Sequence, residues 1–142
     1  MRKRWSELKG SDTSLGVFYP MNYIFAVFDS YESAQRAEQR LLAAGYGEDE
    51  VLALTGEYMI AEYEKVLKDA NWLDRVQQKI SQAVGCEVAY IREAIGLAKQ
   101  GAGFLAVYSP TEREAQRTVR LVKPENPKTM RRYLRLAIED LS

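Results

Sequence analysis

Two stretches of the chain share one pattern of apolar and polar positions. Each opens with a short, continuous apolar run, Tyr23–Phe28 in the first and residues 104–108 in the second, which is typical of a buried strand. An apolar stripe at helical spacing follows each run: Ala34, Ala37, Leu41 and Ala44 in the first copy, and Ala115, Val119 and Val122 in the second. The runs themselves match at an offset of 80 residues, since Phe25-Ala26-Val27-Phe28 corresponds to Leu105-Ala106-Val107-Tyr108. We therefore predict a duplicated strand-then-helix unit.

The residues between strand and helix carry start and stop signals. Asp29 or Ser30 can cap the first helix, and Gly45 ends it. In the second copy, Ser109-Pro110-Thr111-Glu112 reads as a capping box with proline at the first helical position. Glycines that follow helices and precede strands are expected to act as helix stops; these are Gly45, Gly47, Gly101 and Gly103.

A short second strand is expected at residues 50–54, so each copy becomes one strand–helix–strand half of an α+β, ferredoxin-like domain with a four-stranded antiparallel sheet. The fourth strand is the least determined element. Met130, Tyr133, Leu134, Ala137, Ile138 and Leu141 form a helical stripe, yet the same segment alternates as a strand. Because the repeat requires a strand after the second helix, and Pro124 and Pro127 break the chain before it, we predict a strand at about 129–137.

The two halves are separated by residues 57–100, which are too many for a loop and are rich in helix formers. Two or three inserted helices are expected, with a break at Gly85. Residues 22–142 then form one domain, preceded by an arm at 1–21 that is expected to be partly flexible. Both faces of the predicted central strands are apolar, so the face opposite the repeat helices must be covered by the insertion or by another subunit.

The amino-acid composition limits the kinds of partner and the cellular setting that we expect for this protein. Twenty Lys and Arg residues balance twenty Asp and Glu residues, so no overall field attracts nucleic acid or anionic lipid. The apolar runs are too short to span a bilayer, and residues 1–9 lack a following apolar signal segment. Cys86 is the single cysteine, which excludes an intramolecular disulfide and suits a reducing, cytoplasmic setting.

The sequence contains few of the residue combinations that catalytic sites commonly use. The absence of histidine removes the usual general base and the commonest transition-metal ligand. Cys86 has neither a base nor a resolving partner in the sequence, and the acidic residues Glu48, Asp49 and Glu50 are expected to form a solvated turn rather than a cation site. We assign no catalytic, cofactor or metal residue, no cofactor, and no enzyme activity.

A binding surface is the remaining function class. Residues from the insertion and from the arginine-rich end form the candidate interaction surface: Trp72, Val76, Ile80, Tyr90, Arg131, Arg132, Tyr133 and Arg135. The leading hypothesis is a non-enzymatic interaction or regulatory module that forms a homo-oligomer, with a homodimer as the simplest form. Two alternatives stay open: a small-molecule or catalytic pocket between sheet and insertion, and nucleic-acid binding through the basic C-terminal region, which the intervening acidic residues disfavour.

Several segments also resemble small, largely uncharacterised bacterial proteins related to the general stress protein domain. These segments are Val27-Phe28-Asp29, Ala43-Ala44-Gly45-Tyr46, Thr55-Gly56-Glu57, Gly103-Phe104-Leu105-Ala106-Val107 and the closing run from Arg132 to Leu141. The resemblance covers residue 22 to the end. It implies a bacterial, stress-associated setting and no established chemistry.

Overall fold

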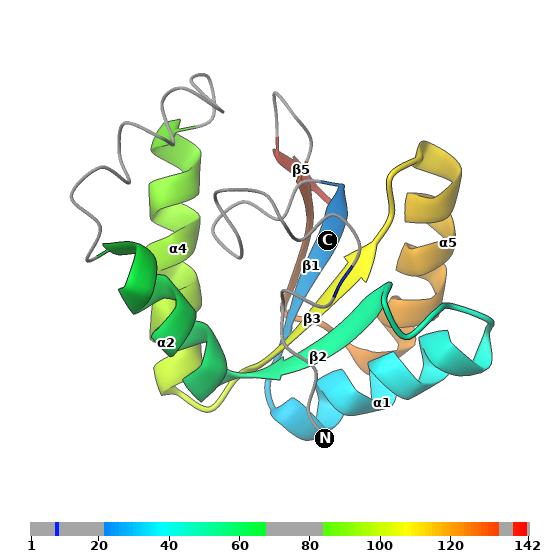
Figure 1. Cartoon of the computed structure of the whole chain (residues 1–142), viewed down its shortest axis with the longest axis horizontal. Helices are drawn as coiled ribbons and strands as arrows, with labels where there is room; N and C mark the ends of the chain where they lie inside the picture. Colours follow the sequence, from blue (N-terminus) through cyan, green and yellow to red (C-terminus); the bar gives the residue numbers. More distant parts are fainter. Residues whose placement is uncertain (1–7, 9–21, 68–83, 134–137, 142) are drawn as a thin grey trace.

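The computed structural model describes residues 8, 22–67, 84–133 and 138–141, with backbone only at 65–67, 84–91 and 138. The described elements, in chain order, are β1 (Tyr23–Phe28), α1 (Tyr31–Ala43), β2 (Val51–Thr55), α2 (Gly56–Leu67), α4 (Val84–Lys99), β3 (Gly103–Tyr108), α5 (Glu112–Val122), the short 3-10 helix η3 (Lys123–Glu125), β4 (Thr129–Tyr133) and β5 (Ile138–Asp140). The predicted α+β class is confirmed (Figure 1).

The strands form one antiparallel sheet in the order β2-β3-β1-β4-β5. β1 and β3, the strands of the repeated unit, pair with each other along their whole length, from Tyr23 opposite Tyr108 to Phe28 opposite Gly103. The prediction of four strands is wrong, because β5 adds a fifth strand at the β4 edge. The antiparallel sheet itself is as predicted.

β4 resolves the choice between strand and helix at the start of the disputed segment. Residues 129–133 pair with β1, and residues 138–140 pair back onto β4. The helical interpretation is therefore wrong for these residues. The predicted strand also included 134–137, which lie outside the described residues. In the strand, Met130 lies beside Ala26 and is buried in the core.

The two repeat helices, α1 and α5, cover the same face of the sheet (Figure 1). Their buried residues join one apolar cluster with Ile24, Ala26 and Phe28 of β1 and Leu105 and Val107 of β3. Ser30 is the N-cap of α1, and its hydroxyl accepts the Ser33 N–H. Thr111 is the N-cap of α5, so Pro110 precedes the cap and is not the first helical residue as predicted. Ser109 instead is buried beneath α5.

Two of the four predicted helix stops are confirmed and two are wrong. Gly45 and Gly101 have positive φ, and in each case the next residue donates its N–H to a carbonyl five positions back, Tyr46 to Leu41 and Ala102 to Leu97. Gly103 instead lies where the start of β3 meets the backbone of Ser30 and Tyr31 too closely for any Cβ. Gly47 lies under the side chains of its own turn. Gly85, predicted as a break, lies in the first turn of α4.

The opposite face of the sheet is covered by the insertion. Tyr23, Phe25 and Phe104 lie in a second apolar cluster with Met59 and Tyr63 of α2. Ala98, near the end of α4, and Leu8, the one described residue of the predicted arm, join the same cluster. One chain thus buries both faces of β1 and β3 without a second subunit. None of the helices in the described ranges has the length and apolar character needed to cross a membrane.

Candidate interaction groove

Five of the eight predicted surface residues have no described side chain. Trp72, Val76, Ile80 and Arg135 lie outside the described residues, and Tyr90 belongs to α4 with only its backbone described. The other three, Arg131, Arg132 and Tyr133, are consecutive on β4 and therefore alternate between the two faces of the sheet.

These three β4 residues do not form an exposed basic surface. The Arg132 side chain is 6 % exposed; its Nε donates to the Ser109 carbonyl (3.3 Å) and its Nη1 to Glu112 Oε2 (2.9 Å). Arg131 projects to the other face, is 15 % exposed and pairs with Glu93 of α4 at 3.3 Å. Tyr133 is buried in the second cluster. Both guanidinium groups are therefore paired within the molecule, which leaves them poorly placed to contact phosphates.

The β4–β5 hairpin brings opposite charges together. Its register sets Arg131 opposite Asp140 and Arg132 opposite Glu139, and directly opposite residues project to the same face of a sheet. The sequence analysis placed the arginines in a basic C-terminal region and named no acidic partners for them, so it missed this pairing. The signal was present: two basic residues and two acidic residues flank a connecting segment in the order that an antiparallel register requires.

A buried chain of hydroxyl groups holds α5 against the sheet. Ser109 Oγ donates to the Val107 carbonyl at 3.3 Å and lies 3.0 Å from Thr118 Oγ1, which lies 2.8 Å from the Tyr46 hydroxyl. Because each hydroxyl has one proton, Thr118 must donate to Ser109 and Tyr46 to Thr118. The Arg117 guanidinium covers the Tyr46 ring, 4.8 Å from its centroid. The hydroxyl chain thereby ties the middle of α5 to the end of β3 and to the loop after α1.

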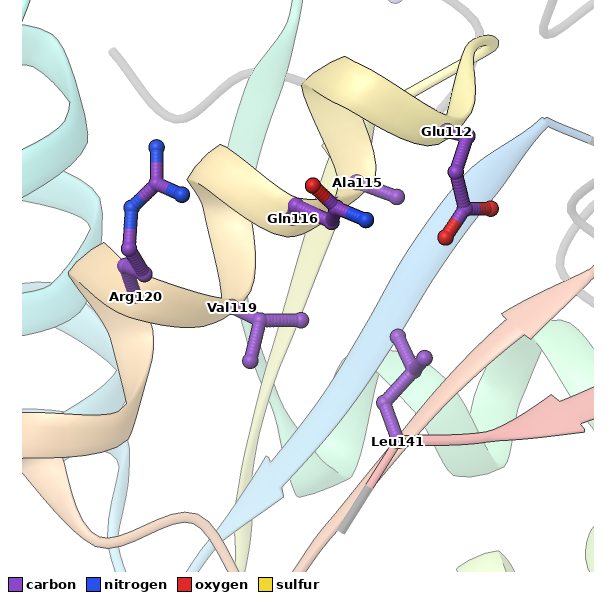
Figure 2. Close-up of a pocket in the computed structure, with 6 residues that line it drawn as sticks. All are labelled: Glu112, Ala115, Gln116, Val119, Arg120 and Leu141. Carbon is purple, nitrogen blue, oxygen red and sulfur yellow. The ribbon is translucent and has the colours of Figure 1, made fainter.

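A groove of about 350 Å³ runs between α5 and the end of β5. Leu141 projects from the β5 side toward α5, while Val119 projects from α5 into the same space (Figure 2). Ala115 completes the apolar floor, and Leu141 is held in place by its N–H bond to the Met130 carbonyl at 2.8 Å. The groove is therefore part of the fixed fold rather than of a loose terminus.

Three exposed polar residues of α5 form the rim of the groove. Glu112, Gln116 and Arg120 follow one another in a row, with Glu112 at one end and Arg120 at the other (Figure 2). Their spacing of four residues places them on one side of the helix. The row carries a negative charge, a neutral amide and a positive charge, and the Glu112 carboxylate keeps its position through its bond to the buried Arg132.

The acidic turn at residues 48–50, just before β2, is closed by one of its own carboxylates. Glu50 Oε1 accepts the Gly47 N–H at 2.7 Å, which closes the turn.

Burial raises the pKa of the nearby Tyr23 hydroxyl far above its ordinary value, and Tyr108, Asp49 and Glu50 raise it further. Within the described ranges, no three Cys, Asp or Glu side chains are grouped so that they could hold a metal ion.

Comparison of the chain with family models, with curated proteins and with solved structures gives no match.

Proposed function

We propose that this chain is a non-enzymatic interaction module that self-associates as a two-fold dimer through the groove between α5 and the β4–β5 hairpin. A two-fold interface uses the same patch on both subunits, so the patch must complement itself. The α5 rim has this property: antiparallel contact of two copies about Gln116 sets Glu112 of each copy against Arg120 of the other. The apolar floor residues Val119 and Leu141 of both copies then lie within the same interface.

The self-complementary rim is the observation that carries the proposal. The sequence suggested an oligomer because both faces of the central strands are apolar, but a single chain buries both faces. The rim is therefore the reason to expect an oligomer. The nucleic-acid alternative loses support because Arg131 and Arg132 point inward and are paired. The pocket alternative, between sheet and insertion, stays a prediction, because residues 68–83 of the insertion lie outside the described residues.

We also propose a ferredoxin-like fold and a cellular location for this protein. The order β2-β3-β1-β4, with α1 and α5 on one face, supports a ferredoxin-like arrangement of the two halves, to which β5 is an addition. A bacterial, cytoplasmic and stress-associated role rests on the sequence resemblance and on the single cysteine.

Charge reversal with rescue tests the interface. We expect wild-type protein to have the mass of a dimer by light scattering after size exclusion. Arg120→Glu should be monomeric, because the Glu112 carboxylate of each copy then faces the introduced carboxylate of the other. Glu112→Arg should also be monomeric. An equimolar mixture of these two variants should recover the dimer, because one copy then carries two carboxylates and the other two guanidinium groups, so both contacts across the axis become attractive again.

Two controls keep this test decisive. Arg40→Glu makes the same charge change on the exposed surface of α1, outside the groove, and should remain dimeric. Glu112→Arg places a cation beside buried Arg132, so its thermal unfolding must be recorded. If this variant does not fold, Arg120→Gln serves instead. Its dimer should be weaker than that of the wild type but stronger than that of Arg120→Glu. A monomeric wild type, or an Arg120→Glu variant that stays dimeric, would overturn the proposal.

A further inference from the structure

The outer edge of β2 presents backbone groups that β3 does not bind. Among the described strands, β2 pairs only with β3 and ends the sheet. The Tyr108 N–H donates to the Glu50 carbonyl at 2.7 Å, so Glu50, and by alternation Leu52 and Leu54, direct their backbone groups toward β3. Val51, Ala53 and Thr55 consequently direct theirs outward. An edge of this kind is a template for pairing with another strand.

One of these outward groups is already occupied by a side chain. The Ala53 N–H, at the middle of β2, donates to Glu38 Oε2 at 2.8 Å. Glu38 is half-buried on α1, next to the stripe formed by Ala34, Ala37 and Leu41, and α1 packs directly along β2. The helix therefore holds a carboxylate against the open edge of the sheet at the point where an added strand would have to bond.

The β2 sequence makes such protection necessary. Val51–Thr55 reads Val-Leu-Ala-Leu-Thr, with no charge and no proline, which is the composition of strands that pair readily with copies of themselves. Antiparallel pairing of two β2 edges about Ala53 would set Val51 against Thr55 of the second copy. It would also bring two Glu38 carboxylates to the same axis, where they would repel each other.

We propose that Glu38 is a gate that closes the β2 edge, and that β2 of a second copy is the partner this edge accepts once the Glu38 carboxylate is removed. The gate acts in two ways: its oxygen occupies the Ala53 donor, and its charge opposes the approach of an identical chain. This surface is separate from the α5 groove, which lies between α5 and the end of β5, at the other edge strand of the sheet.

The test uses the Arg120→Glu background, so that association through the α5 groove does not contribute. In that background, Glu38→Ala should raise the mass measured by light scattering to that of a dimer or a higher assembly. The backbone amides of Val51, Ala53 and Thr55, which point away from β3, should become protected from hydrogen exchange as the protein concentration rises. Should Arg120→Glu prove dimeric, the exchange measurement still reports on the β2 edge alone.

Two matched variants separate the gate from a general loss of acidic charge. Glu32→Ala removes an exposed carboxylate from the first turn of the same helix and should leave mass and exchange unchanged. Glu38→Gln keeps an oxygen that can accept from Ala53 and should associate less than Glu38→Ala. A folded Glu38→Ala variant with unchanged mass and unchanged exchange at residues 51–55 would refute the inference, and equal association of the Gln and Ala variants would contradict the role of the Ala53 hydrogen bond.

Discussion

The two helical layers on either side of the sheet are held in different ways. α1 and α5 each begin at a side-chain cap and bury a stripe of small and aliphatic residues, so their positions follow from signals within about a dozen residues. α2 and α4 pack on each other and meet the sheet through Met59, Tyr63 and Ala98, while Gly56 joins α2 directly to β2. Local sequence therefore specifies one layer, and tertiary contact specifies the other.

A cavity in each helical layer tests whether the two layers are equally coupled to the sheet. Leu41 of α1 and Met59 of α2 are both fully buried, on opposite faces of the sheet. Leu41→Ala and Met59→Ala should each lower the free energy of unfolding in urea by about 2–5 kcal/mol. If both layers unfold together, the dependence on urea concentration stays unchanged in both variants. A Met59→Ala variant with a shallower dependence would show that the insertion unfolds by itself.

Smaller effects are expected at the glycine junctions. A Cβ on Gly103 would overlap the backbone of Ser30 and Tyr31, and one on Gly56 would lie 2.7 Å from the Ala98 carbonyl oxygen. Gly103→Ala and Gly56→Ala should each lower the stability measured by thermal unfolding, by about 1–3 kcal/mol, because backbone atoms cannot move aside as flexible side chains can.

Gly96 provides the matched control for these two junctions. It lies inside α4 with open space where a Cβ would go. Gly96→Ala should raise the stability by about 0.5–1 kcal/mol, because alanine loses less backbone freedom than glycine on entering a helix. A loss of stability at Gly96, or none at Gly56, would contradict the tight junction between α2 and α4.

The smallest effect appears only in alkaline solution and concerns Tyr23. Its pKa is raised in the folded protein, so above the unfolded value of 10.0 the folded state holds a proton that the unfolded state releases. Stability should therefore fall as the pH rises above about 10, by up to about 1.4 kcal/mol per pH unit from this residue. Tyr23→Phe should show a shallower decline in urea unfolding between neutral and alkaline pH; an identical decline would assign the effect to other tyrosines.

Much of the sheet and the first helical layer could be predicted because their signals are local. The run Tyr23–Phe28 is continuous and apolar because β1 is buried on both faces, and Ser30 and Gly45 bound α1 as expected. Ser109 and Pro110 misled the prediction of the α5 start, since Ser109 has the residue type of a cap but its hydroxyl is used in the buried chain to Thr118 and Tyr46. Local propensity does not reveal which of two hydroxyls a neighbouring element will claim.

The candidate site was harder to predict because it depends on which residues face each other across the fold. Arg131 and Arg132 look like part of a basic patch until the register with Asp140 and Glu139 is known. The groove rim on α5 was not predicted, because it forms a groove only with Leu141, which the pairing of β5 with β4 brings to the same side. Charge order across a possible hairpin was the signal available in advance.

The pairing of β1 with β3 has a consequence for how the chain reaches this structure. Neither strand–helix–strand half contains a strand pair of its own, because β1 bonds to β3 and β4, and β2 bonds to β3 alone among the described strands. The partners in the central pair are 75 residues apart at Phe28 and Gly103 and 85 apart at Tyr23 and Tyr108. Thr55 of β2 and Gly103 of β3 are 48 residues apart, so even the nearest strands of the two repeats pair only after a long loop has closed. The duplication is therefore two interlocked halves rather than two modules that fold one after the other.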